Sequence, residues 1–386
     1  MRLLSYLNIS NIDDIESDSG YIFNYTLSNE LALRGIEYYI ILPTKLKAAN
    51  ITRFAPEKCY YVDMGHTKYE VRYRFQWEYV AQIIREVKPD IFFLNQVELC
   101  ATVKALLNVY SLENIIIATY CHYPALHVST SGDIIPDYTL NDSNLVESIL
   151  YNIYSAINLS DAFFVQSNFA KTLLVGYAKK NNIALKKEIG ILPPPYDYNL
   201  YIAALTSKRS PKILYNHRLY DSYGTKDFIR FVMENPDLSF LVTDPMSNRA
   251  SDRSRYNSTP YINRKVLSSL KNVQLIDGAN RENYLNAIDS CCMAIAPVRR
   301  ACVWSMAIID CYSRGIPVVG PEYASFPEII PKSLLFHDES EEREIIDRLL
   351  HDASFYTNAI KACQDILPNI SPARIADQFI SVITDH

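Results

Sequence analysis

The segment 215–228, YNHRLYDSYGTKDF, contains the first cluster of residue types that could do chemistry. It follows a predicted strand over residues 212–215 and precedes a predicted helix. Arg218 could clamp a phosphate through two parallel hydrogen bonds, and the N-terminus of the following helix also favours an anion. Asn216 and His217 directly precede this arginine. The alternative is a surface loop with an ordinary arginine.

A second segment, 297–330, suggests related chemistry. It places Trp304, Ser305 and Met306 at the start of a predicted helix, after a strand expected over residues 293–296. The unpaired N–H groups of that helix start would face a pyrophosphate. Further along the helix, Asp310 could accept a hydrogen bond from a ribose hydroxyl.

Two residues of the first half are candidates for direct contact with a substrate. His122 follows a strand expected to end at residue 120 and could hydrogen-bond a substrate, although a lone histidine there is more often structural. Asp18, beside Gly20, could touch a second substrate or serve in a turn or helix cap. His127 has no comparable support and is assigned to a loop.

The elements that must position these residues alternate between strand and helix. Strands are expected over residues 2–7, 38–42, 91–94, 115–120 and 162–166, with helices over 21–34, 77–87, 145–158 and 169–177 between them. This rhythm predicts βαβ units and parallel sheets covered on both faces. Three prolines at 193–195 interrupt the rhythm, which then restarts.

The fold class predicted from this pattern is α/β, with two Rossmann-like doubly wound domains facing a central cleft. The domains expected are residues 1–195, residues 196–365, and a C-terminal helix within 366–386 that could return to the first domain. Ligands of such sheets bind beyond the carboxyl ends of the strands, which is where the candidate segments fall.

Composition agrees with a globular protein of two ordinary domains: the chain has 386 residues, 49% of them hydrophobic, and a net charge of −5. No apolar run is long enough to predict a membrane span, and the first residues do not resemble a signal peptide. The eight cysteines include no CxxC pair, which favours reduced thiols over a zinc site. A cytoplasmic protein without a metal site is therefore expected.

The region 245–300 is locally basic, with nine Lys or Arg residues against four Asp or Glu residues. Within it, the polar stretch 248–264 lacks periodicity and is expected to be a long mobile loop. Its arginines are Arg249, Arg253, Arg255 and Arg264. Such a patch could bind the phosphate of a nucleotide or of DNA, or be a solvated surface loop.

Together these motifs resemble the GT-B glycosyltransferases of the family 4 type, which use nucleotide sugars. The chain has Trp304-Ser305 where the family has Phe-Gly, Asp310 where it has a ribose-binding Glu, an unchanged Gly-Ile-Pro-Val-Val at 315–319, and Pro327-Glu328. The resemblance implies transfer of a sugar from a nucleotide-diphosphate sugar, first of all a UDP-sugar, to a hydroxyl acceptor. It also implies retention at the anomeric carbon, no metal and no permanently bound cofactor.

The resemblance assigns roles to the candidates. It makes His122 and Asp18 the catalytic candidates, and the donor-binding candidates are Gly20, Asn216, His217, Arg218, Arg299, Arg300, Trp304, Ser305, Met306 and Asp310. The chain departs from the family at Tyr223, where a Lys is usual, and at Cys302, where an acidic residue is usual. Arg299 and Arg300 could replace the missing cation.

Two alternatives follow from these departures and from the basic loop. In the first, the acceptor is a hydroxymethylated base in phage DNA, and the protein would then work in the host cytoplasm. In the second, the chain is a non-catalytic subunit that binds a sugar nucleotide. An epimerase of the same fold is a further possibility.

Overall fold

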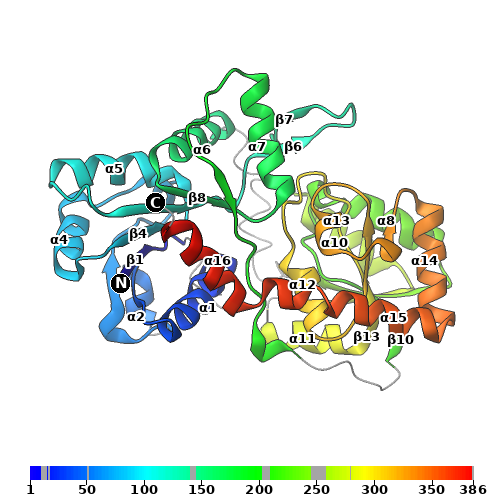
Figure 1. Cartoon of the computed structure of the whole chain (residues 1–386). Coiled ribbons are helices and arrows are strands. Elements are labelled where there is room, and N and C mark those ends of the chain that lie inside the picture. Colours follow the sequence, from blue (N-terminus) through cyan, green and yellow to red (C-terminus); the bar gives the residue numbers. More distant parts are fainter. Residues whose placement is uncertain are drawn as a thin grey trace.

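The computed structural model describes residues 1–9, 15, 18–49, 52–139, 145–201, 209–244, 258–278 and 280–384. These residues form two parallel β-sheets of seven and six strands, each covered by helices (Figure 1). The predicted α/β class with two doubly wound units is confirmed. Among the described residues, none of the helices combines the length and the apolar character that crossing a bilayer would need.

The first sheet is entirely parallel. Its strand order is β3 (Cys59–Val62), β2 (Glu37–Pro43), β1 (Arg2–Tyr6), β4 (Ile91–Leu94), β5 (Ile116–Tyr120), β8 (Ala162–Val165) and β9 (Ile189–Ile191). β4 (IFFL) and β8 (AFFV) are buried along their whole length, as expected when helices cover both faces. Consecutive residues of β1 face opposite cores, since Leu3 and Leu4 belong to different apolar clusters.

Helices connect these strands on both faces of the first sheet. They are α1 (Ser19–Leu33), α2 (Thr44–Ala49), α3 (Lys68–Tyr73), α4 (Trp77–Val87), α5 (Cys100–Val109), α6 (Val146–Leu159) and α7 (Asn168–Lys180). α1 ends shortly before Gly35, which was predicted to terminate it and has φ 74°. A hairpin of β6 (Leu126–Val128) and β7 (Ile134–Pro136) lies outside the sheet and contains His127, so its assignment to a loop was wrong.

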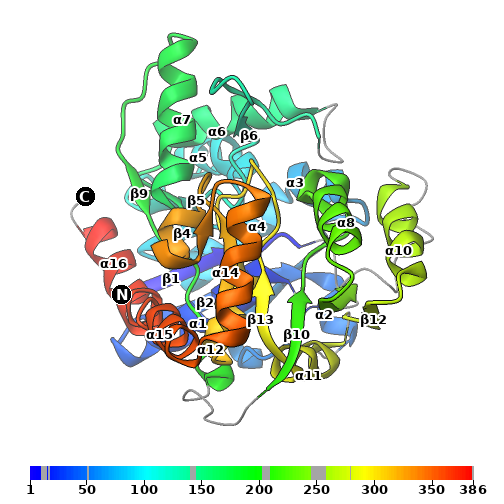
Figure 2. The same cartoon turned by 90° about the vertical axis from the view of Figure 1, so that its right-hand side faces the viewer.

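The second sheet repeats the plan with six strands. The order is β12 (Val273–Asp277), β11 (Ser239–Asp244), β10 (Ser210–Tyr215), β13 (Cys291–Ile295), β14 (Val318–Pro321) and β15 (Leu335–Phe336). Its helices are α8 (Thr225–Glu234), α10 (Thr259–Ser269), α11 (Arg281–Ser290), α12 (Met306–Ser313), α13 (Phe326–Ile329), α14 (Glu339–His351) and α15 (Ala353–Gln364) (Figure 2).

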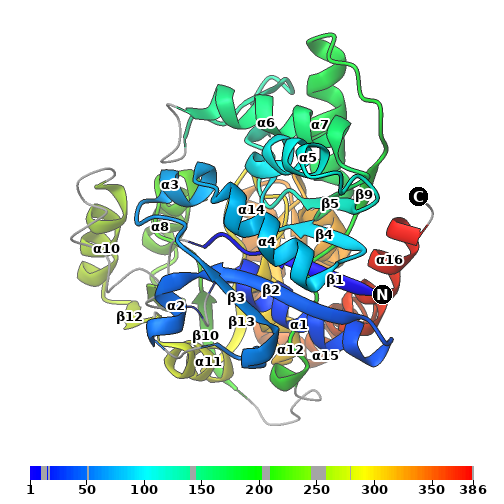
Figure 3. The same ribbon diagram turned by 90° about the vertical axis from the view of Figure 1, so that its left-hand side faces the viewer.

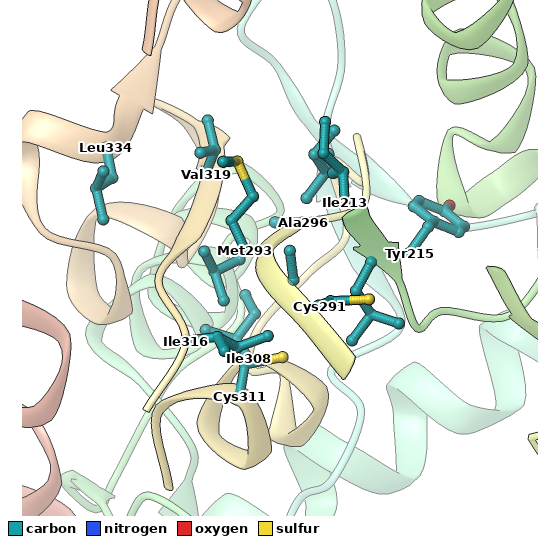
Figure 4. Close-up of a cluster of buried hydrophobic side chains, with 14 of the residues drawn as sticks. Ile213, Tyr215, Cys291, Met293, Ala296, Ile308, Cys311, Ile316, Val319 and Leu334 are labelled. Atoms are coloured by element: carbon teal, nitrogen blue, oxygen red, sulfur yellow. The ribbon is translucent and has the colours of Figure 1, made fainter. Parts of the chain in front are cut away.

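The core of the second unit includes several of the cysteines. Cys291 and Cys311 lie among Met293, Ile308 and Ile316 (Figure 4), and every cysteine is free. Burial raises the pKa of the Cys291 thiol to about 11, so it stays protonated and unreactive at neutral pH.

The described end of the stretch 248–264 differs from the expected loop. From Thr259 onward it belongs to α10, in which Pro260 occupies the first turn and Asn263 and Leu267 are buried. The loop prediction was therefore wrong for residues 259–264. One narrow stripe of buried side chains is enough to hold a helix on a neighbouring surface. Arg264 pairs with Asp244 at 2.5 Å. Arg249, Arg253 and Arg255 lie outside the described residues.

The C-terminal helix α16 (Pro372–Thr384) crosses back to the first unit and packs on α1 (Figure 3). Phe379 contacts the rings of Phe93 and Phe164 inside the first core. On the surface, Arg34 donates to Asp377 at 2.6 Å and to the Ala373 carbonyl at 2.8 Å. The end of the chain therefore joins the two units.

Candidate active site

The candidate segments of the second unit meet where β10 and β13 end. Gly224, before α8, has φ 70°, and a Cβ there would lie 2.5 Å from the carbonyl oxygen of Val298. Only glycine allows this contact between the two loops. The loop after β13 is also held by both units, since Cys302 belongs to the second core and Val303 packs into the first.

Arg218 is the free cation of the loop after β10. Its backbone stands between the buried residues His217 and Leu219, while its own side chain is exposed. Its guanidinium forms no hydrogen bond or ion pair with any described group. A guanidinium presented in this way at the carboxyl end of a strand can clamp a phosphate.

Arg299 and Arg300 are neighbours in sequence but face different tyrosines. The guanidinium of Arg299 lies 4.3 Å from the ring centroid of Tyr223. That of Arg300 lies 5.2 Å from the ring centroid of Tyr323. Because Tyr223 stands where the family that the motifs resemble has its lysine, Arg299 brings a cation to this place from the loop after β13.

The first turn of α12 follows the loop after β13, which contains Arg299 and Arg300. Ser305 is its N-cap residue but makes no side-chain capping bond, and Met306 is the first helical residue. The preceding Trp304 is half-buried, and its Nε1 has no acceptor among the described residues. The backbone N–H groups of this turn are therefore available to an anion.

Asp310 lies on α12 and is already engaged by two residues of α11. The carboxylate is 8% exposed, and its Oδ2 accepts from Tyr284 Oη at 3.0 Å and from Arg281 Nη1 at 3.1 Å. Asn216 Nδ2 donates to the same Tyr284 oxygen at 3.1 Å, which makes Asn216 a positioning residue for this chain of hydrogen bonds. Arg281 and Tyr284 were not predicted as site residues from the sequence. Their position after a strand was the feature that could have indicated them.

His217 is a buried neutral histidine in the same loop. It is 6% exposed, its ring packs edge-on against Tyr215, and its Nε2 has no partner among the described residues. Burial lowers the pKa of His217 to about 3.

This burial predicts an acid-sensitive fold. The unfolded chain protonates His217 near pH 6.5 and the folded chain only near pH 3, so the unfolded state binds more protons between these values. Stability present above pH 6.5 is therefore lost as the pH falls, by about 1.4 kcal/mol per pH unit from this group. Urea unfolding between pH 6 and 4 should include this slope alongside the contributions of other groups, and His217→Asn should reduce the total slope by about that amount. The exposed-histidine control His66→Asn should leave it unchanged; an unchanged slope in His217→Asn would contradict the assignment.

In the first unit, His122 belongs to a buried amide network. Asn24 Nδ2 donates to the Gly20 carbonyl and to Asn95 Oδ1, both at 2.8 Å. Asn95 Oδ1 is thus an acceptor, so the His122 Nε2 that lies 2.9 Å from it must carry a proton. Burial lowers the pKa of His122 to about 4. The ring is therefore neutral near pH 7, and its Nδ1 carries a lone pair.

Gly20 and Asp18 form the start of α1. Gly20 lies in the first turn of the helix, where a Cβ would stand 2.8 Å from Asn95 Nδ2, so a larger residue would disturb the His122 network. Asp18 is the N-cap of α1, and its side chain accepts from the Tyr21 N–H at 3.0 Å. A role of Asp18 toward a substrate remains a prediction.

Glu328, from the Pro327-Glu328 motif, connects the two units at the cleft. Its carboxylate accepts from the backbone N–H of Asn168 at 2.8 Å and of Phe169 at 2.6 Å, at the N-terminus of α7. A carboxylate is favourable at this helix end because of the helix dipole. The contact fixes the position of one unit against the other, which sequence spacing could not reveal.

Solved structures with this two-unit architecture are glycosyltransferases of the GT-B fold. Sucrose-phosphate synthase of Thermosynechococcus elongatus has a TM-score of 0.75 at 12% identity, covering 100% of this chain and 98% of that one. HepE of Anabaena in complex with UDP-glucose has a TM-score of 0.68 at 12% identity, with both chains covered fully. An α-glucosyltransferase in complex with UDP-glucose and DNA containing an abasic site has a TM-score of 0.63 at 12% identity, covering 100% and 99%.

At this level of identity the similarity establishes the fold. The chain has the GT-B fold, as the resemblance of its motifs implied. No protein-family model matches the chain, and no curated protein matches its sequence.

Proposed function

We propose that the protein is a glycosyltransferase that moves a sugar from a nucleotide-diphosphate sugar, with UDP-sugars as the first candidates, to a hydroxyl acceptor. The observation that carries the proposal is the free guanidinium of Arg218 in the same group of strand-end loops as Arg299 and the uncapped start of α12. These groups suit a pyrophosphate. The complex of HepE with UDP-glucose, which has the same fold, supports this choice of donor.

In the proposed reaction the bond between the anomeric carbon and the phosphate oxygen breaks, and the acceptor oxygen bonds to that carbon. The acceptor proton passes to the departing phosphate, and the proposal includes retention of the anomeric configuration. Arg218, Arg299 and the N–H groups of α12 would stabilise the negative charge that grows on the leaving group. This charge stabilisation needs no bound metal.

His122 is assigned a positioning role within this proposal. Its neutral ring donates through Nε2 to Asn95, so Nδ1 is left to accept a hydroxyl of the transferred sugar. A pKa of about 4 makes the ring a weak base at neutral pH.

The test is incubation of the purified chain with UDP-, GDP- and ADP-sugars, measuring release of the nucleotide and the rise in Tm. One nucleotide series is expected to raise the Tm and to be hydrolysed slowly or transferred. If no nucleotide sugar in the panel raises the Tm or releases its nucleotide, the proposal is overturned. A rise in Tm without turnover on any acceptor would instead indicate a non-catalytic subunit that binds a sugar nucleotide.

Asp310 provides a kinetic prediction. Asp310→Ala should raise the donor KM about tenfold with little change in kcat, because a ribose contact is equally strong in ground and transition states. Arg281→Ala is the matched control: it frees the carboxylate from its ion pair and should not raise the KM. A loss confined to kcat would place Asp310 beside the reacting carbon instead.

A hydroxymethylated base in DNA is a second candidate acceptor, favoured by the basic region 245–300 and by the fold shared with the DNA-bound α-glucosyltransferase. Each lost phosphate contact lowers the slope of log K against log salt by about 0.9. Replacing Arg253 and Arg255 by Gln should therefore flatten the salt dependence of duplex binding. Donor hydrolysis should stay unchanged. A salt slope equal to that of the unaltered chain would remove this candidate's main support.

A further inference from the structure

A cavity of about 840 Å³ is lined by residues of α8 and α14 among others. Both helices are labelled in Figure 2. Its walls come from Phe228 and Phe231 of α8 and from Phe336 at the end of β15, and His127 and Asp137 of the first unit also line it. Arg218, Arg299 and Asp310 are not among the lining residues. A volume of this size is typical of small-molecule sites, which span about 300–1,000 Å³.

Glu342, on α14, lines this cavity and has no partner. Its side chain is 5% exposed and forms no hydrogen bond or ion pair with any described group. Burial, together with the like charges of Glu339 and Asp227, raises the pKa of Glu342 to about 8. A buried carboxyl without a partner is costly to ionise, so a cation bound beside it would stabilise its charged form.

Most other charged groups around Glu342 already have ionic or hydrogen-bond partners, while the guanidinium of Arg300 contacts only the Tyr323 ring among the described groups. Arg230 pairs with Glu339 and, at 3.2 Å, with Asp227. Asp338 accepts the N–H groups of Ser340 and Glu341 as the N-cap of α14. His337 pairs with Glu322 and Glu341, both at 2.9 Å. Glu342 is thus the carboxyl of this cavity that is left for a ligand.

Three further features of the wall define the ligand. The hydroxyl of Tyr323 and Nδ1 of His127 are buried atoms with no hydrogen-bond partner among the described residues. The guanidinium of Arg300 lies over the Tyr323 ring. Tyr215, Phe228, Phe231 and Phe336 add aromatic side chains to a mixed wall, and aromatic faces attract organic cations.

We propose that this cavity binds an organic ammonium compound, with Glu342 as its counter-ion and the aromatic walls around its apolar part. A single free carboxyl matches a single positive charge, whereas a divalent cation requires several oxygen ligands. The Tyr323 hydroxyl and His127 Nδ1 add hydrogen bonds to the ammonium or to neighbouring hydroxyls. Arg300, one of the donor-binding candidates, lines this cavity, whereas Arg218, Arg299 and Asp310 do not, so the proposed binding does not rest on the transfer reaction.

The test measures binding to the full chain without any nucleotide sugar, by calorimetry and by the rise in Tm. The probes are 1-aminopentane and glucosamine, which separate an aliphatic amine from an amino sugar, with 1-pentanol and glucose as their neutral counterparts. At least one amine should bind and its neutral counterpart should not. Because Glu342 is mostly protonated at pH 7 and ionised beside an ammonium, binding should release close to one proton.

Substitutions make the test specific. Glu342→Gln, which keeps the shape of the side chain, should raise the Kd of the amine at least tenfold and abolish proton release. Tyr323→Phe should weaken binding severalfold, and Glu344→Gln, an exposed position on the same helix, should have no effect. Equal binding of 1-pentanol and 1-aminopentane, binding of Ca²⁺ in place of the amines, no binding, or unchanged affinity in Glu342→Gln would each overturn the proposal.

Discussion

Replacing Arg218 by Ala is expected to lower kcat/KM for sugar transfer at least ~10²-fold. The guanidinium has no other described partner, so its loss removes a charge-assisted clamp on the leaving phosphate and little else. Steady-state kinetics with the donor found in the nucleotide-sugar panel measures the effect, and the urea midpoint should stay unchanged.

Two further variants separate phosphate binding from general loss of charge. Arg218→Lys keeps the charge but not the two-pronged geometry, and should recover only part of the activity. Lys226→Ala removes a nearby cation that pairs with Asp221 at 2.7 Å, and should change kcat/KM less than about threefold. If Arg218→Ala itself changes kcat/KM by less than about threefold in a folded protein, the arginine does not bind the donor.

Arg299→Ala is expected to have a comparable effect, a loss of about 10²-fold in kcat/KM. Its guanidinium lies over Tyr223, at the place where the resembling enzymes carry a lysine. Moving the charge between the two positions provides the decisive variant. Tyr223→Lys combined with Arg299→Ala should recover at least tenfold of the loss, because the cation is restored from the other loop.

The neighbouring arginine is the matched control for this experiment. Arg300→Ala removes a cation one residue away that faces Tyr323 instead of Tyr223, and should reduce kcat/KM by less than about fivefold. Equal losses in the two single variants, with no recovery in the double variant, would mean that the loop after β13 responds to charge in general.

Much of the fold could be predicted from the sequence alone. Short buried runs such as residues 91–94 and 162–166, alternating with helical periodicity, defined two parallel sheets, and the stop of the first helix was visible at Gly35. These features are local, because the side-chain period and the backbone freedom of glycine act within a few residues. Since parallel sheets bind ligands where their strands end, local pattern also indicated which loops contain the candidate site.

The partners within those loops were decided by tertiary structure. Arg299 and Arg300 are equivalent in sequence, and only the packing against Gly224 separates the tyrosines that they face. Asp310 is held by Arg281, and the protonated nitrogen of His122 is fixed by Asn95. α10 was missed because its buried stripe is defined by a neighbouring surface.

The sequence by itself determined the two sheets and the loops at their carboxyl ends, because strand and helix patterns depend on neighbours along the chain. The tertiary structure decided which charges are free and which are paired. The packing of the two units brings Glu328 to the start of α7, and the packing of α14 leaves Glu342 without a counter-ion. Such contacts join residues far apart in the chain, and their energy depends on distance and burial, which sequence spacing does not specify.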